Sequence, residues 1–234
     1  MNRPKLKPSP VPAGFTRADL LATLAALVLF ACVTLPLLAN SRPRSERVQC
    51  VNNLRQIAAG FQAWGDGHGD VEPWEVALAE GGTFQHALAA NVWFHFAWMS
   101  NELASPKILL CPSDTGRPAR DFSGDPAGGY LHPNFANRAT SYFLSHPRGF
   151  RPEDMLAGDR NLSGGTSGSC SRFSAAYLVN RPGIPNLAWT SALHDQSGNV
   201  LALDGRVEQF NTTQLQRSQA TFDDTRAIHY ISPR

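Results

Sequence analysis

The longest apolar stretch of the chain covers residues 20–38, which carry almost no polar side chain. As a helix, these 19 residues would be about 28 Å long, close to the thickness of the hydrocarbon core of a bilayer. The residues before it include Arg3, Lys5 and Lys7 and, up to Asp19, no acid. The pattern therefore predicts a single membrane-spanning helix near the N-terminus.

A second helical pattern covers residues 46–64, where apolar residues recur every three or four positions. Its apolar face holds Val48, Val51, Leu54, Ile57, Ala58 and Phe61. Such a face needs a sheet or another helix to cover it. Between the two helical patterns, Pro36 and Pro43 are expected to interrupt the helix, because a proline removes a backbone donor. The Gly-Asp-Gly sequence at residues 65–67 is expected to end it in a left-handed backbone.

The C-terminal part alternates apolar segments with turn signals. Strands are expected at residues 187–193, 200–203 and 206–210. Residues 195–199 make the first turn, and Asp204-Gly205 predicts a two-residue hairpin turn in which both residues take positive φ. Residues 67–130, rich in glycine, proline and aromatics, would connect helix and sheet. The pattern predicts an α+β fold with one long N-terminal helix packed on an antiparallel sheet that includes a three-strand meander.

The residues before the apolar run carry a more specific signal. Gly14 and Phe15 precede the run, and a lone acid, Asp19, lies at its start. A secretory signal would place its apolar stretch before the cleavage site, whereas here the glycine comes first. This arrangement resembles the N-terminus of type IV prepilins and type II secretion pseudopilins. The resemblance implies that prepilin peptidase cuts after Gly14 and methylates Phe15. An anchor that is never processed is the alternative.

The same resemblance assigns roles to two further residues. The carboxylate of Asp19 would neutralise the terminal amine of a neighbouring subunit in a filament; relatives usually have Glu at this position. Pro36 would be the helix-perturbing proline of the family. The implied N-terminus is cytoplasmic and the C-terminal domain periplasmic, with the chain crossing the inner membrane once. The implied segments are a leader at residues 1–14, a transmembrane half-helix at 15–38, an exposed half-helix at 39–66 and a β-rich domain at 67–234.

Further segments resemble the prepilin-type subfamily with an H-x9-D-G motif near the C-terminus. They are residues 50–57 (CVNNLRQI), 110–114 (LCPSD), 141–143 (SYF), 156–161 (LAGDRN) and His194 with Asp204-Gly205. In the predicted meander, His194 and Asp204 lie at opposite ends of a strand, roughly 15 Å apart, too far to share one metal ion. Structural roles are favoured for both, and a metal or ligand site remains the alternative.

Three other segments have candidate chemistry. Residues 66–72 alternate oxygen ligands in a loop, which suits Ca²⁺, although a solvated turn is favoured. Residues 93–98 hold four aromatic rings and a histidine, and a buried core segment is favoured over a binding patch. Residues 164–169 lack the Lys-Ser/Thr ending of a phosphate-binding loop and predict a mobile loop. The seven histidines show no zinc-binding spacing.

The four cysteines divide by position. Cys32 lies in the apolar run and is expected to be a small filler. The other three would face an oxidising compartment, where disulfides persist. Cys50 on the exposed half-helix and Cys111, at the end of a strand-like segment at residues 108–110, are favoured as a disulfide, which leaves Cys170 free.

The charge balance and the motifs together indicate the expected function. Without its leader the chain would hold 18 Lys and Arg against 19 Asp and Glu, so no nucleic-acid partner is expected. No cofactor and no catalytic residue is expected, and a separate ATPase would drive extrusion. The expected function is a structural subunit of a type II secretion pseudopilus or a type IV pilus-like filament, with prepilin peptidase, other pilin subunits and the secretion platform as partners. The alternative is a membrane-anchored extracytoplasmic module that binds a glycan or a cation.

Overall fold

The computed structural model of the 234-residue chain describes residues 14, 16–146, 152–164, 166–167, 178–180, 187–220 and 228–233. The chain divides into two compact units, Met1–Arg44 and Ser45–Arg234. We call the second unit the head. Helix α1 (Arg17–Asp66) runs from the first unit into the second.

Helix α1 begins with a reciprocal cap. The Thr16 hydroxyl accepts a hydrogen bond from the Asp19 backbone N–H (3.2 Å), and Asp19 Oδ2 accepts one from the Thr16 N–H (2.9 Å). The helix then continues through Pro36 and Pro43, so the predicted interruption is wrong. Each proline removes one backbone donor, and a helix of 50 residues retains the other hydrogen bonds of its ladder.

The first unit contains an apolar helical segment. Among the described residues, Arg17–Leu35 is the one candidate membrane span, 19 residues long with a mean hydropathy of 2.3, and none of it is buried in the protein. Leu21, Leu29 and Phe30 each keep about two thirds of their surface exposed. This helix is therefore long and apolar enough to cross a membrane.

The head end of α1 is amphipathic. Its buried hydrophobic residues are Cys50, Leu54, Ile57, Phe61 and Trp64, spaced four or three apart. Val48 is exposed, so the predicted apolar face is wrong at that end. The helix ends at Asp66 as expected, but the left-handed residues are Gly69 and Asp70, not residues 65–67.

Residues 67–141 contain short helices and contribute to the core. They are η1 (Leu78–Glu80), α2 (Val92–Trp98), α3 (Ser100–Leu103), η2 (Pro106–Leu109) and η3 (Ala136–Ala139). The predicted strand at residues 108–110 is wrong, because η2 occupies this segment. Pro106 suits the first turn of a helix, and the Ser105 side chain accepts the Lys107 N–H, which caps it. This part of the chain is thus more than a connection.

The head contains a mainly antiparallel β-structure. Its strands are β1 (Tyr142–His146), β2 (Met155–Asp159), β3 (Leu162–Ser163), β4 (Thr166–Ser167), β5 (Leu178–Asn180), β6 (Ala188–Trp189), β7 (Ser197–Ala202), β8 (Val207–Asn211) and β9 (Ile228–Ile231). In the described residues, one sheet has the order β4-β5-β9-β1-β2-β7-β8, and β3 pairs with β6 separately. The predicted three-strand meander is wrong, since β7 lies between β2 and β8 and does not pair with β6. The fold is nevertheless α+β with an antiparallel sheet.

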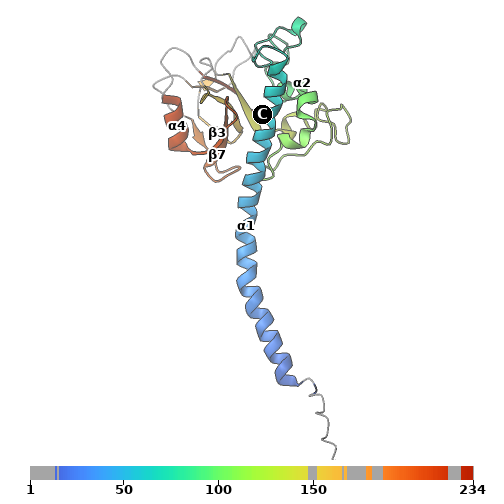
Figure 1. Cartoon of the computed structure of the whole chain (residues 1–234), viewed down its shortest axis with the longest axis vertical. Helices are drawn as coiled ribbons and strands as arrows, with labels where there is room; N and C mark the ends of the chain where they lie inside the picture. Colours follow the sequence, from blue (N-terminus) through green and yellow to red (C-terminus); the bar gives the residue numbers. More distant parts are fainter. Residues whose placement is uncertain are drawn as a thin grey trace, which may run out of the picture. The chain divides into compact units, whose positions relative to one another are not determined.

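The larger sheet is covered on both faces, because alternate residues of a strand point to opposite sides. In β1, Tyr142 and Leu144 join the cluster that contains the buried face of α1 and part of α2. Phe143 between them joins a second cluster, with Trp189 of β6 and Leu215 of α4 (Thr212–Ala220). Figure 1 shows α2 beside α1 and α4 on the other side of the sheet.

The β7–β8 hairpin corrects the predicted turn. Leu201 pairs with Val207, and the Ala202 N–H donates to the Arg206 carbonyl oxygen (2.9 Å), which leaves a three-residue loop of Leu203, Asp204 and Gly205. Only Gly205 has positive φ, at 81°, so Asp204-Gly205 is not a two-residue turn. A three-residue loop that ends in a left-handed glycine is a common hairpin connection. The longer loop shifts the register by one residue and places apolar Leu201 opposite apolar Val207.

Candidate functional site

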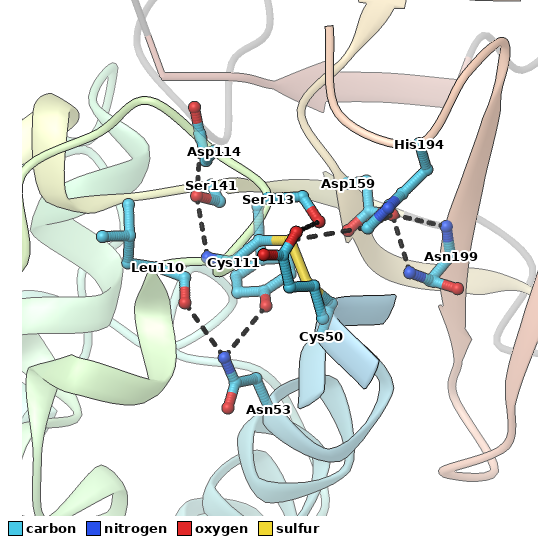
Figure 2. Close-up of a disulfide and its surroundings, with 12 residues drawn as sticks. Cys50, Asn53, Leu110, Cys111, Ser113, Asp114, Ser141, Asp159, His194 and Asn199 are labelled. Atoms are coloured by element: carbon cyan, nitrogen blue, oxygen red, sulfur yellow. Dashed lines mark hydrogen bonds and ion pairs between the residues drawn. A yellow bond between two sulfur atoms is a disulfide. The ribbon is translucent and has the colours of Figure 1, made fainter. Parts of the chain in front are cut away.

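A buried disulfide joins α1 to the loop that follows η2. Cys50 lies on α1, and Cys111 follows two residues after η2. The structure contains a Cys50–Cys111 disulfide, the pairing favoured from the sequence, with a Cα–Cα distance of 5.1 Å. Both cysteines are fully buried. Figure 2 shows this bond and its surroundings. Cys32 is a free, exposed cysteine in the first unit, and Cys170 lies outside the described residues.

His194 contacts the disulfide from the side of the sheet. Its Nε2 atom lies 3.4 Å from Cys111 Sγ and 3.5 Å from Asp159 Oδ2. His194 belongs to the turn at residues 191–196, not to the end of a strand as predicted. The turn is held because the His194 carbonyl accepts a hydrogen bond from Arg47 Nη2 (2.7 Å) and another from Ser197 Oγ. The imidazole is thereby positioned between a sulfur atom and a carboxylate.

Asp159 provides the carboxylate of this site from the end of β2. It is fully buried, and its Oδ2 atom accepts hydrogen bonds from the Asn199 backbone N–H (2.6 Å) and side-chain Nδ2 (2.9 Å). Its Oδ1 atom has no hydrogen-bond partner among the described residues. Figure 2 shows Asn199 and His194 on the same side of Asp159.

Burial controls the protonation of this pair. It raises the pKa of Asp159, against the effect of the hydrogen bonds from Asn199. It lowers the pKa of His194, and the positive charge of Arg47 lowers it further. Both shifts disfavour the charged forms, as expected for groups enclosed by protein.

A second network surrounds the disulfide on the side of η2. Ser141 Oγ accepts a hydrogen bond from the Cys111 N–H (3.0 Å) and donates one to Asp114 Oδ2 (2.6 Å). Arg160 binds both oxygens of the same Asp114 carboxylate, each at 2.7 Å. Bidentate pairs of this kind combine charge with directional hydrogen bonds. The network therefore ties the Cys111 loop to the start of β1 and the end of β2.

Asn53, one turn after Cys50, completes the connection. Its Nδ2 atom donates to the Leu110 carbonyl oxygen (3.0 Å) and lies 3.3 Å from the Tyr142 hydroxyl. All five segments that resemble the prepilin-type subfamily thus contribute residues to this one place. They are represented by Cys50 and Asn53, Cys111 and Asp114, Ser141 and Tyr142, Asp159 and Arg160, and His194.

Asp204 and Gly205, the other half of the H-x9-D-G motif, lie elsewhere in the head. They form the loop after β7, a strand of six residues that rises about 3.3 Å per residue. Asp204 is exposed and bound to its neighbour Arg206, which donates to Oδ1 from its backbone (3.0 Å) and to Oδ2 from its side chain (2.6 Å). The geometry gives Asp204 and Gly205 a role in the turn and separates them from His194.

A pocket of about 490 Å³ lies between the end of α1, residues 70–72 and the β7–β8 loop. Glu72 lines it and is only 8% exposed, and burial raises the pKa of its carboxyl to about 7. Among the described residues, one group of three or more candidate metal ligands has its ligand atoms within 4.8 Å of one another, and it consists of Cys50, Cys111 and His194. The acidic side chains of residues 66–72 form no such group.

The aromatic segment at residues 93–98 lies on α2. Phe94, His95 and Phe96 are buried, and Trp93 and Trp98 are half-buried. The His95 ring contacts the Thr83 hydroxyl (3.0 Å) and the Ala89 carbonyl oxygen (2.8 Å). Phe96 and Trp93 belong to the core around α1, as the favoured interpretation of this segment predicts.

Gly14 is exposed, Phe15 lies outside the described residues, and Pro36 lies within α1. Asp19 caps α1 through Thr16. Part of the predicted loop at residues 164–169 is strand, since β4 occupies Thr166–Ser167; residues 165, 168 and 169 lie outside the described residues.

Comparison of the chain with protein-family models, with curated proteins and with solved structures finds no match.

Proposed function

We propose that this chain is a membrane-anchored structural subunit of a pilus-like filament, either a type II secretion pseudopilus or a type IV pilus. The observation that carries the proposal is the composition of α1. One helix contains an apolar segment with no residue buried in the protein and, further along, a stripe that forms the core of the head. The order Gly14, Phe15, Asp19 before and within the apolar segment adds the processing and assembly signals.

The exposed apolar segment needs a partner. In the membrane, lipid covers it; in a filament, the same segment of neighbouring subunits would take the place of lipid. Close packing of apolar helices supplies the cohesion, and no nucleotide or metal is required for it. The subunit is therefore expected to be a building block and not a catalyst.

Asp19 would provide the specific contact. In the isolated chain its carboxylate accepts hydrogen bonds from the Thr16 backbone N–H (2.9 Å) and from the Thr16 hydroxyl (2.8 Å). In the filament it would also face the terminal amine that cleavage creates on a neighbouring Phe15. An acid within an apolar helix bundle is costly without a cation, so this pairing would select the correct stagger between subunits.

Substitutions of Asp19 test the proposal, because they separate helix capping from charge. Asp19→Asn keeps an oxygen that can accept the Thr16 N–H and loses the negative charge. Asp19→Glu keeps both functions. Asp19→Ala loses both. We expect filament yield to be near wild-type for Asp19→Glu and to fall at least about tenfold for both Asp19→Asn and Asp19→Ala.

Processing provides the control for this experiment. The intact mass of all four proteins in membranes should match a chain that begins at methylated Phe15, which shows that any loss of filaments follows cleavage. Wild-type filament yield from Asp19→Asn would mean that the charge has no partner. Wild-type chains that retain Met1 and form no filaments would refute the proposed function as a whole.

A further inference from the structure

We propose that the Cys50–Cys111 pair, in its reduced dithiol form, binds one divalent metal ion of the zinc type, together with His194 and Asp159. The disulfide and the metal would be alternative ways to close the same site. This proposal does not depend on the proposed function, because it concerns only residues inside the head.

Three residues of the types that bind zinc most strongly already meet here. The ligand atoms of Cys50, Cys111 and His194 all lie within 4.8 Å of one another. Two cysteines and a histidine are a usual set for zinc, which takes four ligands in a tetrahedron and prefers sulfur and nitrogen. Asp159 would be the fourth ligand.

Two of the distances between the ligand atoms already fit a tetrahedral metal site. With metal–sulfur bonds of about 2.3 Å and metal–nitrogen or metal–oxygen bonds of about 2.0–2.1 Å, the ligand atoms of a tetrahedron lie about 3.3–3.8 Å apart. His194 Nε2 lies 3.4 Å from Cys111 Sγ and 3.5 Å from Asp159 Oδ2. Both separations match edges of such a tetrahedron. The two sulfur atoms, which are bonded to each other in the disulfide, need to move apart. Asp159 needs to approach them, because it does not belong to the group of ligand atoms that lie within 4.8 Å of one another.

The surroundings of the ligands also suit a metal site. The second carboxylate oxygen, Asp159 Oδ1, is buried with no hydrogen-bond partner among the described residues, which is costly for an acid. Asn199 holds Oδ2, and Arg47 and Ser197 hold the His194 backbone. Outer contacts of this kind orient metal ligands.

A dithiol reductant would open the disulfide before the metal binds. The dithiol transfers two electrons and two protons to the Cys50–Cys111 disulfide and itself becomes a disulfide. The two cysteine thiols then each lose a proton as their sulfur atoms bind the metal ion, so two protons are released for each ion bound. Because both cysteines are fully buried, we expect the ion to enter as the reduced chain folds.

Cobalt(II) is the probe, because thiolate ligands give it a near-ultraviolet charge-transfer band and tetrahedral geometry gives it intense visible bands. The full chain in detergent, with Cys32→Ser and Cys170→Ser in every protein, is reduced in denaturant and refolded without oxygen during a Co²⁺ titration. We expect both sets of bands to saturate at one Co²⁺ per chain and Zn²⁺ to abolish them. The oxidised chain should give neither.

Histidine variants test the ligand set. His194→Ala should weaken Co²⁺ binding at least about tenfold and reduce the visible bands, whereas His132→Ala, in a loop of the same head, should match the parent protein. Cys50→Ser should lose at least half of the charge-transfer band, because one of the two thiolate ligands is absent. If the reduced parent chain binds no Co²⁺, whether it is folded or unfolded, or if His194→Ala binds as tightly as His132→Ala, the proposal is wrong.

Discussion

Glu72 is a buried carboxyl whose charge is opposed by its surroundings. It lines the pocket beside the end of α1, and burial raises its pKa from 4.5 to about 7, with the negative charge of Glu75 adding to the shift. A folded-state pKa above the unfolded value means that protonated Glu72 contributes stability below pH 4.5. That contribution is lost as the pH rises through 7.

Glu72→Gln should therefore change the pH dependence of stability. The variant removes the ionisable group, so its free energy of unfolding should exceed that of wild type at pH 8, by an amount on the order of 3 kcal/mol at most, and should be close to wild type at pH 4. Urea unfolding of the full chain in detergent, followed by tryptophan fluorescence, measures this, since all five tryptophans lie in the head.

Glu80→Gln is the matched control, because Glu80 is exposed at the end of η1. It should leave the pH profile of wild type unchanged. Equal profiles for wild type and Glu72→Gln would show that Glu72 is ionised in the folded head at no cost.

At the scale of elements, the β7–β8 loop depends on one backbone angle. Gly205 has a φ of +81°, and a Cβ atom added there would meet nothing within 4 Å. Gly205→Ala should thus destabilise the head through backbone strain alone, by about 1 kcal/mol. Gly124 is the control, since it has the same open space without a positive φ, and Gly124→Ala should be neutral or slightly stabilising. Equal urea midpoints for the two variants would contradict this.

Elements could be predicted from the sequence where a local pattern decides them. The apolar run, the amphipathic helix, strands β7 and β8 and a turn at Asp204-Gly205 all follow from periodicity or dipeptide preference. The loop length could not be predicted, because a two-residue and a three-residue hairpin share the same Asp-Gly signal and differ only in cross-strand register. The strand predicted at residues 108–110 is wrong for a similar reason, since three apolar residues in a row fit a strand or a helix equally well.

At the scale of the whole molecule, the disulfide links α1 to the loop after η2 across 61 residues of sequence. Cys50→Ser should lower the melting temperature of the oxidised head, in line with a loss of about 2–4 kcal/mol from a cross-link of this length. Cys32→Ser, in the apolar segment of the first unit, should leave the melting temperature unchanged. Alkylation of both Cys50 and Cys111 in the native, unreduced chain would contradict the bond itself.

Only part of the site around this disulfide could be predicted from the sequence. The cysteine pair was favoured because one cysteine lies on a helix that must be covered and the other on a segment able to cover it. The contacts of His194 with Cys111 and Asp159 could not be predicted. They depend on a turn that returns to the start of β7 and on the pairing of β7 with β2, both set by tertiary packing.

The position of β8 at one edge of the seven-stranded sheet has a consequence for crowding. An edge strand presents unpaired backbone groups to which another chain can add a strand and so begin aggregation. Here Arg206, at the entry to β8, forms ion pairs with Asp204 (2.6 Å) and Glu208 (2.8 Å), and Glu208 and Gln209 are exposed. A second copy would have to desolvate these charges to extend the sheet. Many copies of the head can therefore be concentrated at one surface with little tendency to join edge to edge.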